Sequence, residues 1–185
     1  MAATQPTPII RAADPARDAA ACAEIYAPYV TGTAISFEEV PPGADEMAAR
    51  IRHVTATHPW LLADGAGRAL GFAYADRHGD RAAYRWAADV AVYVALGSHR
   101  RGVGRALYTV LLRLLADAEL RRAYAGVTLP NPASVALHEA LGFRPIGVYR
   151  RAGWKHGAWH DVGWWGLDLG AEIDPPPEPG PPRAP

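Results

Sequence analysis

The stretch of sequence that decides the fold spans residues 86–118 and reads WAADVAVYVALGSHRRGVGRALYTVLLRLLADA. Residues 85–94 are rich in Val and Ala, which predicts a buried strand. Residues 102–118 repeat apolar side chains every three or four positions and predict the strongest amphipathic helix of the chain. Between the two lies SHRRGVG, residues 98–104, in which glycines and arginines directly precede the helix. Strand, glycine-rich turn and helix therefore follow one another without a linker.

The turn between this strand and this helix predicts an anion-binding site. Glycine lets a ligand approach the backbone closely, and the free N–H groups at a helix start bind phosphate oxygens. Arg100, Arg101 and Arg105 add permanent positive charge, and residues 90–116 contain no Asp or Glu. A solvated basic helix face and a glycine turn before an ordinary helix remain as alternatives. The dinucleotide pattern G-x-G-x-x-G fails because Leu107 occupies its third glycine position.

The periodicities outside this stretch predict a mixed sheet with helices on its faces, an α/β (mixed α+β) fold. Asp14 and Pro15 form a typical helix start, an N-cap followed by a first-turn proline. The predicted order is β-α-α-β-β-β-α-β-α-β-β. Its strands span residues 9–12, 60–64, 69–76, 85–94, 123–129, 145–151 and 159–169, and its later helices span 46–58, 102–118 and 131–141.

The composition is that of one globular domain with a proline-rich end. The chain has 185 residues, of which 50% are hydrophobic and 21% charged, enough for a substantial core. Seven of the 17 prolines fall in residues 171–185. Such a segment buries too little apolar surface to offset its ordering cost. We therefore predict a single domain over residues 1–170 and a disordered tail over 171–185.

Charge and cysteine content limit the partners and the compartment. The formal net charge is zero, which argues against a uniformly basic nucleic-acid binder. The one cysteine, Cys22, suits a reducing compartment, and neither a signal peptide nor a membrane-length apolar run is visible. His156 and His160 are separated by Gly157, which would break a helix that turned both rings toward one metal. We expect a cytoplasmic protein with no metal, no membrane partner and no nucleic-acid partner.

A second motif lies in TLPNPASVALHEALGF, residues 128–143, which predicts a strand end, an asparagine cap at Asn131 and a short helix carrying His138. A lone helical histidine is usually a core or surface residue. Together, SHRRGVG after a strand and N-x-x-S-x-x-x-H-E-A-L-G-F further on resemble the GNAT superfamily of acetyl-CoA-dependent N-acetyltransferases.

One branch of that superfamily, the phosphinothricin N-acetyltransferases, is similar over about residues 9–169. The segment RRAGWKHGAWHDVGWW, residues 150–165, is specific to this branch. The other similar segments are Tyr26–Tyr29, Ser36-Phe37-Glu38, His58-Pro59-Trp60-Leu61, Ala82-Ala83-Tyr84-Arg85-Trp86, Val92-Tyr93-Val94 and Leu129-Pro130-Asn131.

The resemblance implies the GNAT fold and direct acetyl transfer from acetyl-CoA to a primary amine in a ternary complex. It implies a mostly antiparallel central sheet with a parallel strand pair at the acetyl-CoA cleft, flanked by helices. It also implies a homodimer. The residues expected to bind acetyl-CoA are Val92, Val94, His99, Arg100, Arg101, Gly102, Val103, Gly104, Arg105, Asn131 and Ser134.

Two residues are candidates for the proton transfers. An ammonium must lose a proton before it attacks a thioester, and the departing thiolate benefits from an acid. The base in this branch is a glutamate, and Asp89 occupies its position here with a side chain about 1.5 Å shorter. An intervening water is one way to restore the reach. His138 matches the branch histidine where many relatives have a tyrosine acid. Which of the two is base and which is acid stays open, and Asp89 as a mere ion-pair partner of Arg85 is the alternative.

The resemblance also assigns a substrate-binding set, namely Phe37, Arg81, Tyr84 and Tyr93. Three departures from the branch occur: Gly79 replaces a lysine, Ala91 replaces a threonine, and His99 replaces Gln or Arg. The implied substrate is a small amino acid or analogue such as the herbicide phosphinothricin, methionine sulfoximine or methionine sulfone. The alternatives are an acetyltransferase for another amine, and an acetyl-CoA sensor with little or no catalysis.

Overall fold

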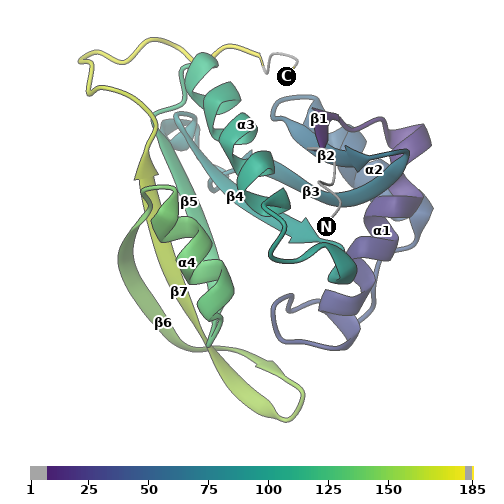
Figure 1. Ribbon diagram of the computed structural model, residues 1–185. Helices are drawn as coiled ribbons and strands as arrows, with labels where there is room; N and C mark the ends of the chain where they lie inside the picture. The colour runs from purple at the N-terminus through teal and green to yellow at the C-terminus, as the bar shows by residue number, and fades with distance from the viewer. Residues whose placement is uncertain (1–7, 182–184) are drawn as a thin grey trace, which may run out of the picture.

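The computed structural model describes residues 8–181 and 185, which form a seven-stranded sheet with helices on both faces (Figure 1). Residues 1–7 and 182–184 lie outside the described residues. The N-terminal segment in which no signal peptide was visible therefore also lies mostly outside them. The helices are α1 (Pro15–Thr31), α2 (Ala44–Thr55), α3 (Val103–Asp117) and α4 (Pro132–Ala140). The strands are β1 (Ile9–Ala12), β2 (Trp60–Gly65), β3 (Arg68–Arg77), β4 (Ala87–Val94), β5 (Arg122–Leu129), β6 (Arg144–Lys155) and β7 (Ala158–Asp168).

The sheet is antiparallel except at one place. Its strand order is β1-β2-β3-β4-β5-β7-β6, and only the neighbours β4 and β5 run parallel. Those two strands are connected through α3, which crosses one face of the sheet (Figure 1). The predicted order of elements and the mixed, mostly antiparallel sheet with its parallel pair are therefore confirmed.

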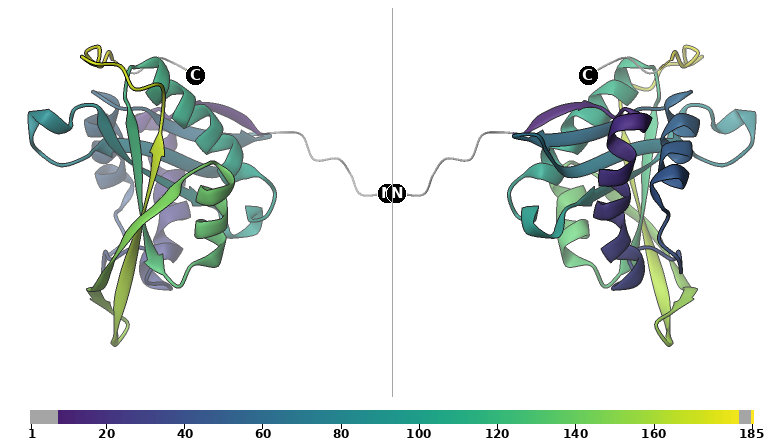
Figure 2. Two further views of the ribbon diagram at one scale, coloured as in Figure 1. Left: turned by 90° about the vertical axis from the view of Figure 1, so that its left-hand side faces the viewer. Right: turned by 90° about the vertical axis from the view of Figure 1, so that its right-hand side faces the viewer.

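Two hydrophobic cores lie on opposite faces of the sheet. Figure 2 shows α1 and α2 on one side of the sheet and α3 on the other. One contains the apolar faces of α1 and α2, and the other contains that of α3. Successive residues of a strand point alternately into the two cores. Trp60 and Leu62 of β2 face α1 and α2, whereas Leu61 and Ala63 face α3. This alternation decides on which face of the sheet each functional side chain lies.

Local sequence signals explain where several elements begin and end. Asp14 caps α1 by accepting hydrogen bonds from the backbone N–H groups of Ala16 and Arg17, and Pro15 follows at the first helical position. The hairpin between β2 and β3 turns at Ala66 and Gly67, with φ values of 55° and 79°. Positive φ at both central residues is the geometry that a two-residue hairpin requires.

The boundaries of several predicted elements differ from the structure. The strand predicted over 85–94 begins at Ala87, because residues 82–84 form a 3₁₀ turn, while Trp86 donates its indole N–H to the carbonyl oxygen of Pro177. The helix predicted over 46–58 is α2, which begins and ends earlier. The two last strands form a longer hairpin than predicted, and it extends past the rest of the sheet (Figure 1, bottom).

The tail that follows β7 contacts the folded body. Residues 171–181 contain no helix or strand. Glu178 accepts two hydrogen bonds of 2.8 Å from Arg85, and the backbone N–H of Gly180 donates to the carbonyl oxygen of Ala118 at 2.9 Å. The disorder of residues 171–185 and the single domain over residues 1–170 stay predictions.

Candidate active site

The strands β4 and β5 separate after three paired positions and leave a cleft in the middle of the sheet. The last pair joins Asp89 to Tyr124. Beyond it, a cavity of about 70 Å³ lies between residues 90–93 and residues 126–128. Its other lining residues are Tyr108, Asn131, Ser134, His138 and Ile35. In the described part of the chain, β4 has no strand partner on this side beyond Asp89. Because Tyr29 and His99 bind the backbone groups of Val94, the edge is open to an extended ligand only before that residue.

The loop before α3 has the features of an anion site. Gly102 is the N-cap of α3 and has a φ of 77°, a left-handed conformation that favours glycine. No side chain caps the helix there, so its first backbone N–H groups are available to an anion. Arg100, Arg101 and Arg105 are exposed around this start. None of the three forms an ion pair within residues 8–181 and 185, so their charge is not neutralised by the protein.

His99 differs from these arginines because protein groups already bind its ring. Its Nε2 lies 2.9 Å from the hydroxyl of Tyr29 and 3.1 Å from the carbonyl oxygen of Val94. The Tyr29 hydroxyl also donates to that carbonyl oxygen at 2.5 Å. His99 therefore joins the loop to α1 and to the end of β4.

Four other residues predicted to bind acetyl-CoA pack against the protein beside this loop. The side chains of Val92, Val94 and Val103 pack in or against the α3 core. A Cβ on Gly104 would lie 3.3 Å from the side chain of Leu137 and 3.6 Å from that of Val94. Glycine at position 104 therefore allows α3 to approach α4 and β4 closely, whereas glycine at position 102 permits the turn.

His138 lies inside the cleft and is held in one tautomer. It is 3% exposed. Its Nδ1 lies 2.7 Å from the carbonyl oxygen of Ser134, which can only accept, so the hydrogen is on Nδ1 and Nε2 is an acceptor. Asn131 caps α4 through the backbone N–H of Ser134, which fixes the turn from which His138 projects. Burial lowers the pKa of His138 and keeps the imidazole neutral.

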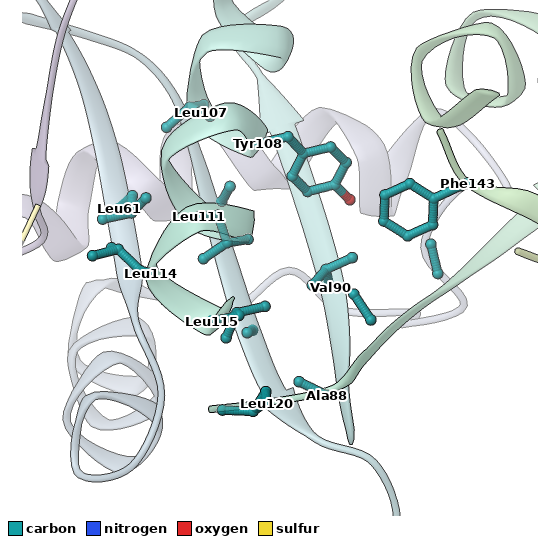
Figure 3. Packing of buried hydrophobic residues seen from close by; sticks show 14 of the residues in the cluster. Leu61, Ala88, Val90, Leu107, Tyr108, Leu111, Leu114, Leu115, Leu120 and Phe143 are labelled. Carbon is teal, nitrogen blue, oxygen red and sulfur yellow. The ribbon is translucent and has the colours of Figure 1, made fainter. Parts of the chain in front are cut away.

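The partner of that Nε2 is Tyr108, whose hydroxyl lies 3.1 Å away. Tyr108 is on the buried face of α3, and Figure 3 shows its oxygen turned away from the leucines toward Phe143. Burial raises the pKa of the phenol, so the hydroxyl stays protonated and donates a hydrogen bond to Nε2 of His138. The cleft therefore contains a protonated phenol supported by a neutral imidazole.

Asp89 has a different histidine partner, His78. The Nδ1 atom of His78 lies 2.7 Å from a carboxylate oxygen of Asp89. Burial raises the pKa of Asp89, with a smaller contribution in the same direction from Asp76, while the hydrogen bond from His78 lowers it. Arg85 pairs with Glu178 instead, so the alternative that Asp89 serves only as an ion-pair partner of Arg85 is wrong.

The two candidate catalytic residues lie on opposite faces of the sheet. Along β4, the side chain of Asp89 points to the same face as that of Tyr93, which packs in the α1 and α2 core. His138 instead contacts Tyr108 of the α3 core. No hydrogen bond joins Asp89 to His138 among the described residues. His138 lines the cavity between the two strands, and Asp89 lies at their last paired position.

The predicted substrate-binding residues are dispersed. Phe37 packs on Gly153 of β6 and is 40% exposed. Tyr84 lies edge-on to His78 with 5.5 Å between ring centroids, so it is close to Asp89. Arg81 lines a cavity of about 530 Å³ closed by the tail residues 179–181, and Tyr93 is packed among the aromatic rings of α1 and β3.

The departures from the branch have structural explanations at two positions. Gly79 has a φ of 72° and lies under the ring of Tyr84, so it forms the turn that follows β3. Ala91 pairs with Tyr74 across β3 and β4 and lines the cavity between β4 and β5. A short side chain there leaves room in the cleft.

A buried lysine fastens the loop that carries Phe37. Lys155, at the end of β6, is 7% exposed and is the only lysine of the chain. Its ammonium donates to the carbonyl oxygens of Val30, Ser36 and Glu38 at 2.5, 2.6 and 2.7 Å. These three bonds hold residues 30–38, including the cavity-lining Ile35, against the β6–β7 hairpin.

Three of these side chains were absent from the predicted site: His78, Tyr108 and Lys155. A hydroxyl among the leucines of an amphipathic helix is a signal for Tyr108, because a buried hydroxyl needs a partner. A sole lysine inside the most family-specific segment is a signal for Lys155. His78 gives no signal in the sequence, since only the register of β3 and β4 brings it to Asp89.

The described residues were also searched for a metal-binding cluster and for a membrane-spanning helix. No group of three or more His, Cys, Asp or Glu side chains within residues 8–181 and 185 is arranged to hold a metal ion. His156 and His160 bond separately to the backbone carbonyl oxygens of Thr33 and Lys155. No helix in this part of the chain is long and apolar enough to cross a membrane.

Known proteins share both the sequence and the fold. The chain is 38% identical over 164 residues to a phosphinothricin N-acetyltransferase of Streptomyces viridochromogenes, covering 89% of this chain and 88% of that one. It is 29% identical over 168 residues to an L-methionine sulfoximine/L-methionine sulfone acetyltransferase of Salmonella typhimurium, covering 90% of this chain and 97% of the other.

A solved structure is similar as well. The phosphinothricin acetyltransferase of Sinorhizobium meliloti, in complex with AcCoA, has a TM-score of 0.85 and 34% sequence identity, covering 89% of this chain and 90% of that one. The family model described as "Acetyltransferase (GNAT) domain" matches residues 10–164, nearly the whole sheet and its helices. The split parallel pair, the anion loop before α3 and this match lead to one conclusion: the chain belongs to the acetyltransferase (GNAT) family.

Proposed function

We propose that the protein transfers an acetyl group from acetyl-CoA to the primary amine of a small amino acid or analogue. The observation that carries the proposal is the cavity between β4 and β5, which His138 and Tyr108 line, in a fold whose α3 also has an uncapped start. The implied substrates are of the phosphinothricin or methionine sulfoximine and sulfone type, as in the relatives named above. Acetylation of phosphinothricin would confer resistance to that herbicide.

The proposed acetyl-CoA site extends from the loop to the cleft. The N–H groups at the start of α3 and the charges of Arg100, Arg101 and Arg105 suit the pyrophosphate. The unpaired edge of β4 at Val92 suits an amide of the pantetheine arm. At Val94, whose backbone groups already bond to Tyr29 and His99, we expect contact through the side chain only. The remaining predicted contacts have supporting roles in this arrangement: His99, Gly102, Val103, Gly104, Asn131 and Ser134.

The proton transfers require a base on one face and an acid on the other. We assign the base to the Asp89 side, because a carboxyl whose pKa is raised by burial accepts a proton more readily than an exposed one. We assign the acid to the Tyr108 hydroxyl, on the His138 side of the sheet. This hydroxyl carries a proton and is held in place by its hydrogen bond to His138. The amine attacks the thioester carbonyl, the carbon–sulfur bond breaks, and the departing thiolate takes up a proton.

A panel of amines tests this function. Protein, acetyl-CoA and phosphinothricin, methionine sulfoximine, methionine sulfone, spermidine or an unrelated amino acid are mixed, and free CoA thiol is followed over time. Turnover with the first three compounds and not with spermidine is expected. Turnover restricted to spermidine would establish a different amine. Acetyl-CoA binding in a thermal-shift assay without turnover on any amine would establish a sensor instead.

We infer a homodimer from the edge of the sheet. β6 is an edge strand of 12 residues that is exposed at nearly every position. It displays large apolar side chains, among them Ile146, Tyr149 and Trp154 with 61, 63 and 58% exposure. A second copy of the chain would cover this face, and light scattering of the purified protein distinguishes dimer from monomer. A cytoplasmic location stays a prediction based on the single buried cysteine.

A further inference from the structure

His78 lies at the point where β4 and β5 separate. It follows the last residue of β3, and its Nδ1 lies 2.7 Å from Asp89. Its ring centroid is 4.5 Å from that of Tyr124, the partner of Asp89 in the last pair of the two strands. The ring of Tyr84 packs edge-on against the other side. The imidazole is therefore fixed by three neighbours above the end of the cleft.

The carboxylate of Asp89 determines which nitrogen of His78 carries the hydrogen. An ionised carboxylate only accepts hydrogen bonds, so Nδ1 must donate and Nε2 keeps its lone pair. No residue within 8–181 and 185 forms a hydrogen bond with Nε2. The side chain is 31% exposed, so the ring is partly open to solvent. A carboxylate-oriented imidazole with a free Nε2 is an arrangement that proteins use for general bases.

His78 also compensates for a departure from the family. Asp89 replaces the glutamate expected there, and its side chain is about 1.5 Å shorter. The imidazole bound to Asp89 extends the reach of that carboxylate by the width of a ring. It therefore takes the place of the intervening water considered above.

We propose that His78 is the catalytic base and that Asp89 orients it. This rests on the function proposed above. In the step, one N–H bond of the substrate ammonium breaks and its proton passes to Nε2 of His78, leaving the electron pair on nitrogen. That pair forms the new bond to the thioester carbonyl carbon, and the carbon–sulfur bond then breaks. The imidazolium stays paired with Asp89 until it releases its proton to solvent.

The decisive experiment combines variants at the two positions. His78→Ala and Asp89→Asn should each lower kcat by roughly 10²-fold. The double variant should be no slower than the slower single variant, because either single change already interrupts the proton relay that the two residues form together. Asp89→Glu in the His78→Ala background should recover about tenfold of the loss, since the longer carboxylate acts directly. His53→Ala, which removes an exposed imidazole on α2, is the matched control and should leave kcat unchanged.

Two further measurements separate catalysis from folding. Free imidazole should rescue His78→Ala in a concentration-dependent way and should not rescue Asp89→Asn. Nitrogen-15 NMR should find His78 with its hydrogen on Nδ1 in the wild type, and a changed tautomer equilibrium in Asp89→Asn. Acetyl-CoA binding and thermal unfolding of each variant report whether it has folded.

The outcomes are distinct. Wild-type kcat in His78→Ala, additive effects of the two single variants, or hydrogen on Nε2 in the folded wild type would each overturn the role of His78 while leaving the acetyl transfer intact. If the wild type transfers acetyl to no amine of the panel, the proposed function fails, and the catalytic role of His78 fails with it.

Discussion

At the scale of single residues, the chemistry of the site depends on which partner each polar group finds. Asp89 and His138 were predicted from the resemblance, because a family motif fixes their positions along the chain. Their hydrogen-bond partners, His78 and Tyr108, lie 11 and 30 residues away in sequence. No periodicity connects such pairs. Only strand register and helix packing bring them together, so sequence reasoning missed them.

Tyr108→Phe tests the acid side of the cleft. The variant keeps the ring that packs against Phe143 but removes the hydroxyl that donates to His138. We expect kcat to fall by roughly 10²-fold because the departing thiolate loses a proton donor. Initial rates at saturating acetyl-CoA and amine give the value.

The matched control is Tyr149→Phe, which removes an exposed hydroxyl on β6. Its kcat should equal that of the wild type. An unchanged kcat in Tyr108→Phe would show that the thiolate obtains its proton elsewhere, for instance from water.

At the scale of elements, the sequence predicts which segments fold but not what holds them against one another. The helix after SHRRGVG was predicted correctly, yet its two glycines have different roles. Gly102 makes the turn, and Gly104 lets α3 pack against Leu137 of α4. A substitution at Gly104 would therefore disturb packing first, and Gly102 is the better position at which to test the predicted anion site. The same applies to the β6–β7 hairpin, whose Lys155 binds a loop more than 100 residues earlier in the chain.

Lys155→Met tests that contact. The change leaves three buried carbonyl oxygens without their donor, so we expect the free energy of unfolding to fall by roughly 3 kcal/mol. Residues 30–38 then loosen, which should raise the KM for the amine about tenfold and leave the KM for acetyl-CoA nearly unchanged. Urea unfolding and steady-state kinetics measure the two effects.

Arg150→Met is the matched control for the lysine variant. It removes a cation from the same strand, but one whose side chain is 78% exposed and pairs with Asp161 at the surface. Both parameters should stay near wild type, because exposed ion pairs contribute little stability. An unchanged amine KM in Lys155→Met would mean that the loop does not position the substrate.

At the scale of the whole molecule, the sheet order places the cleft and separates the two candidate faces. The strands β4 and β5 are parallel neighbours because the chain between them crosses one face of the sheet as α3. Their pairing ends at Asp89. The tail crosses the outside of this assembly and contacts Arg85 and Trp86, which lie just before β4. These contacts are near the surface and do not reach the cavity between β4 and β5.

Removal of residues 171–185 tests whether the tail belongs to the domain. Because its ion pair with Arg85 is exposed, we expect the urea concentration at the unfolding midpoint to stay near that of the full chain. The kcat and both KM values should be those of the full chain. A loss of stability of several kcal/mol, measured by urea unfolding, would instead make the tail part of the folded domain.

The sequence by itself determined the order of the elements, the glycine- and arginine-rich loop before α3 and the positions of Asp89 and His138 along the chain. It could do so because periodicity, capping and family motifs are properties of nearby residues. Only the tertiary structure decided that Asp89 and His138 lie on opposite faces of the sheet, that His78 and Tyr108 are their partners, and that Lys155 fastens the loop over the cleft. The physical reason is that strand register and helix packing join residues far apart in the chain. Each of those contacts depends on the whole core forming at once.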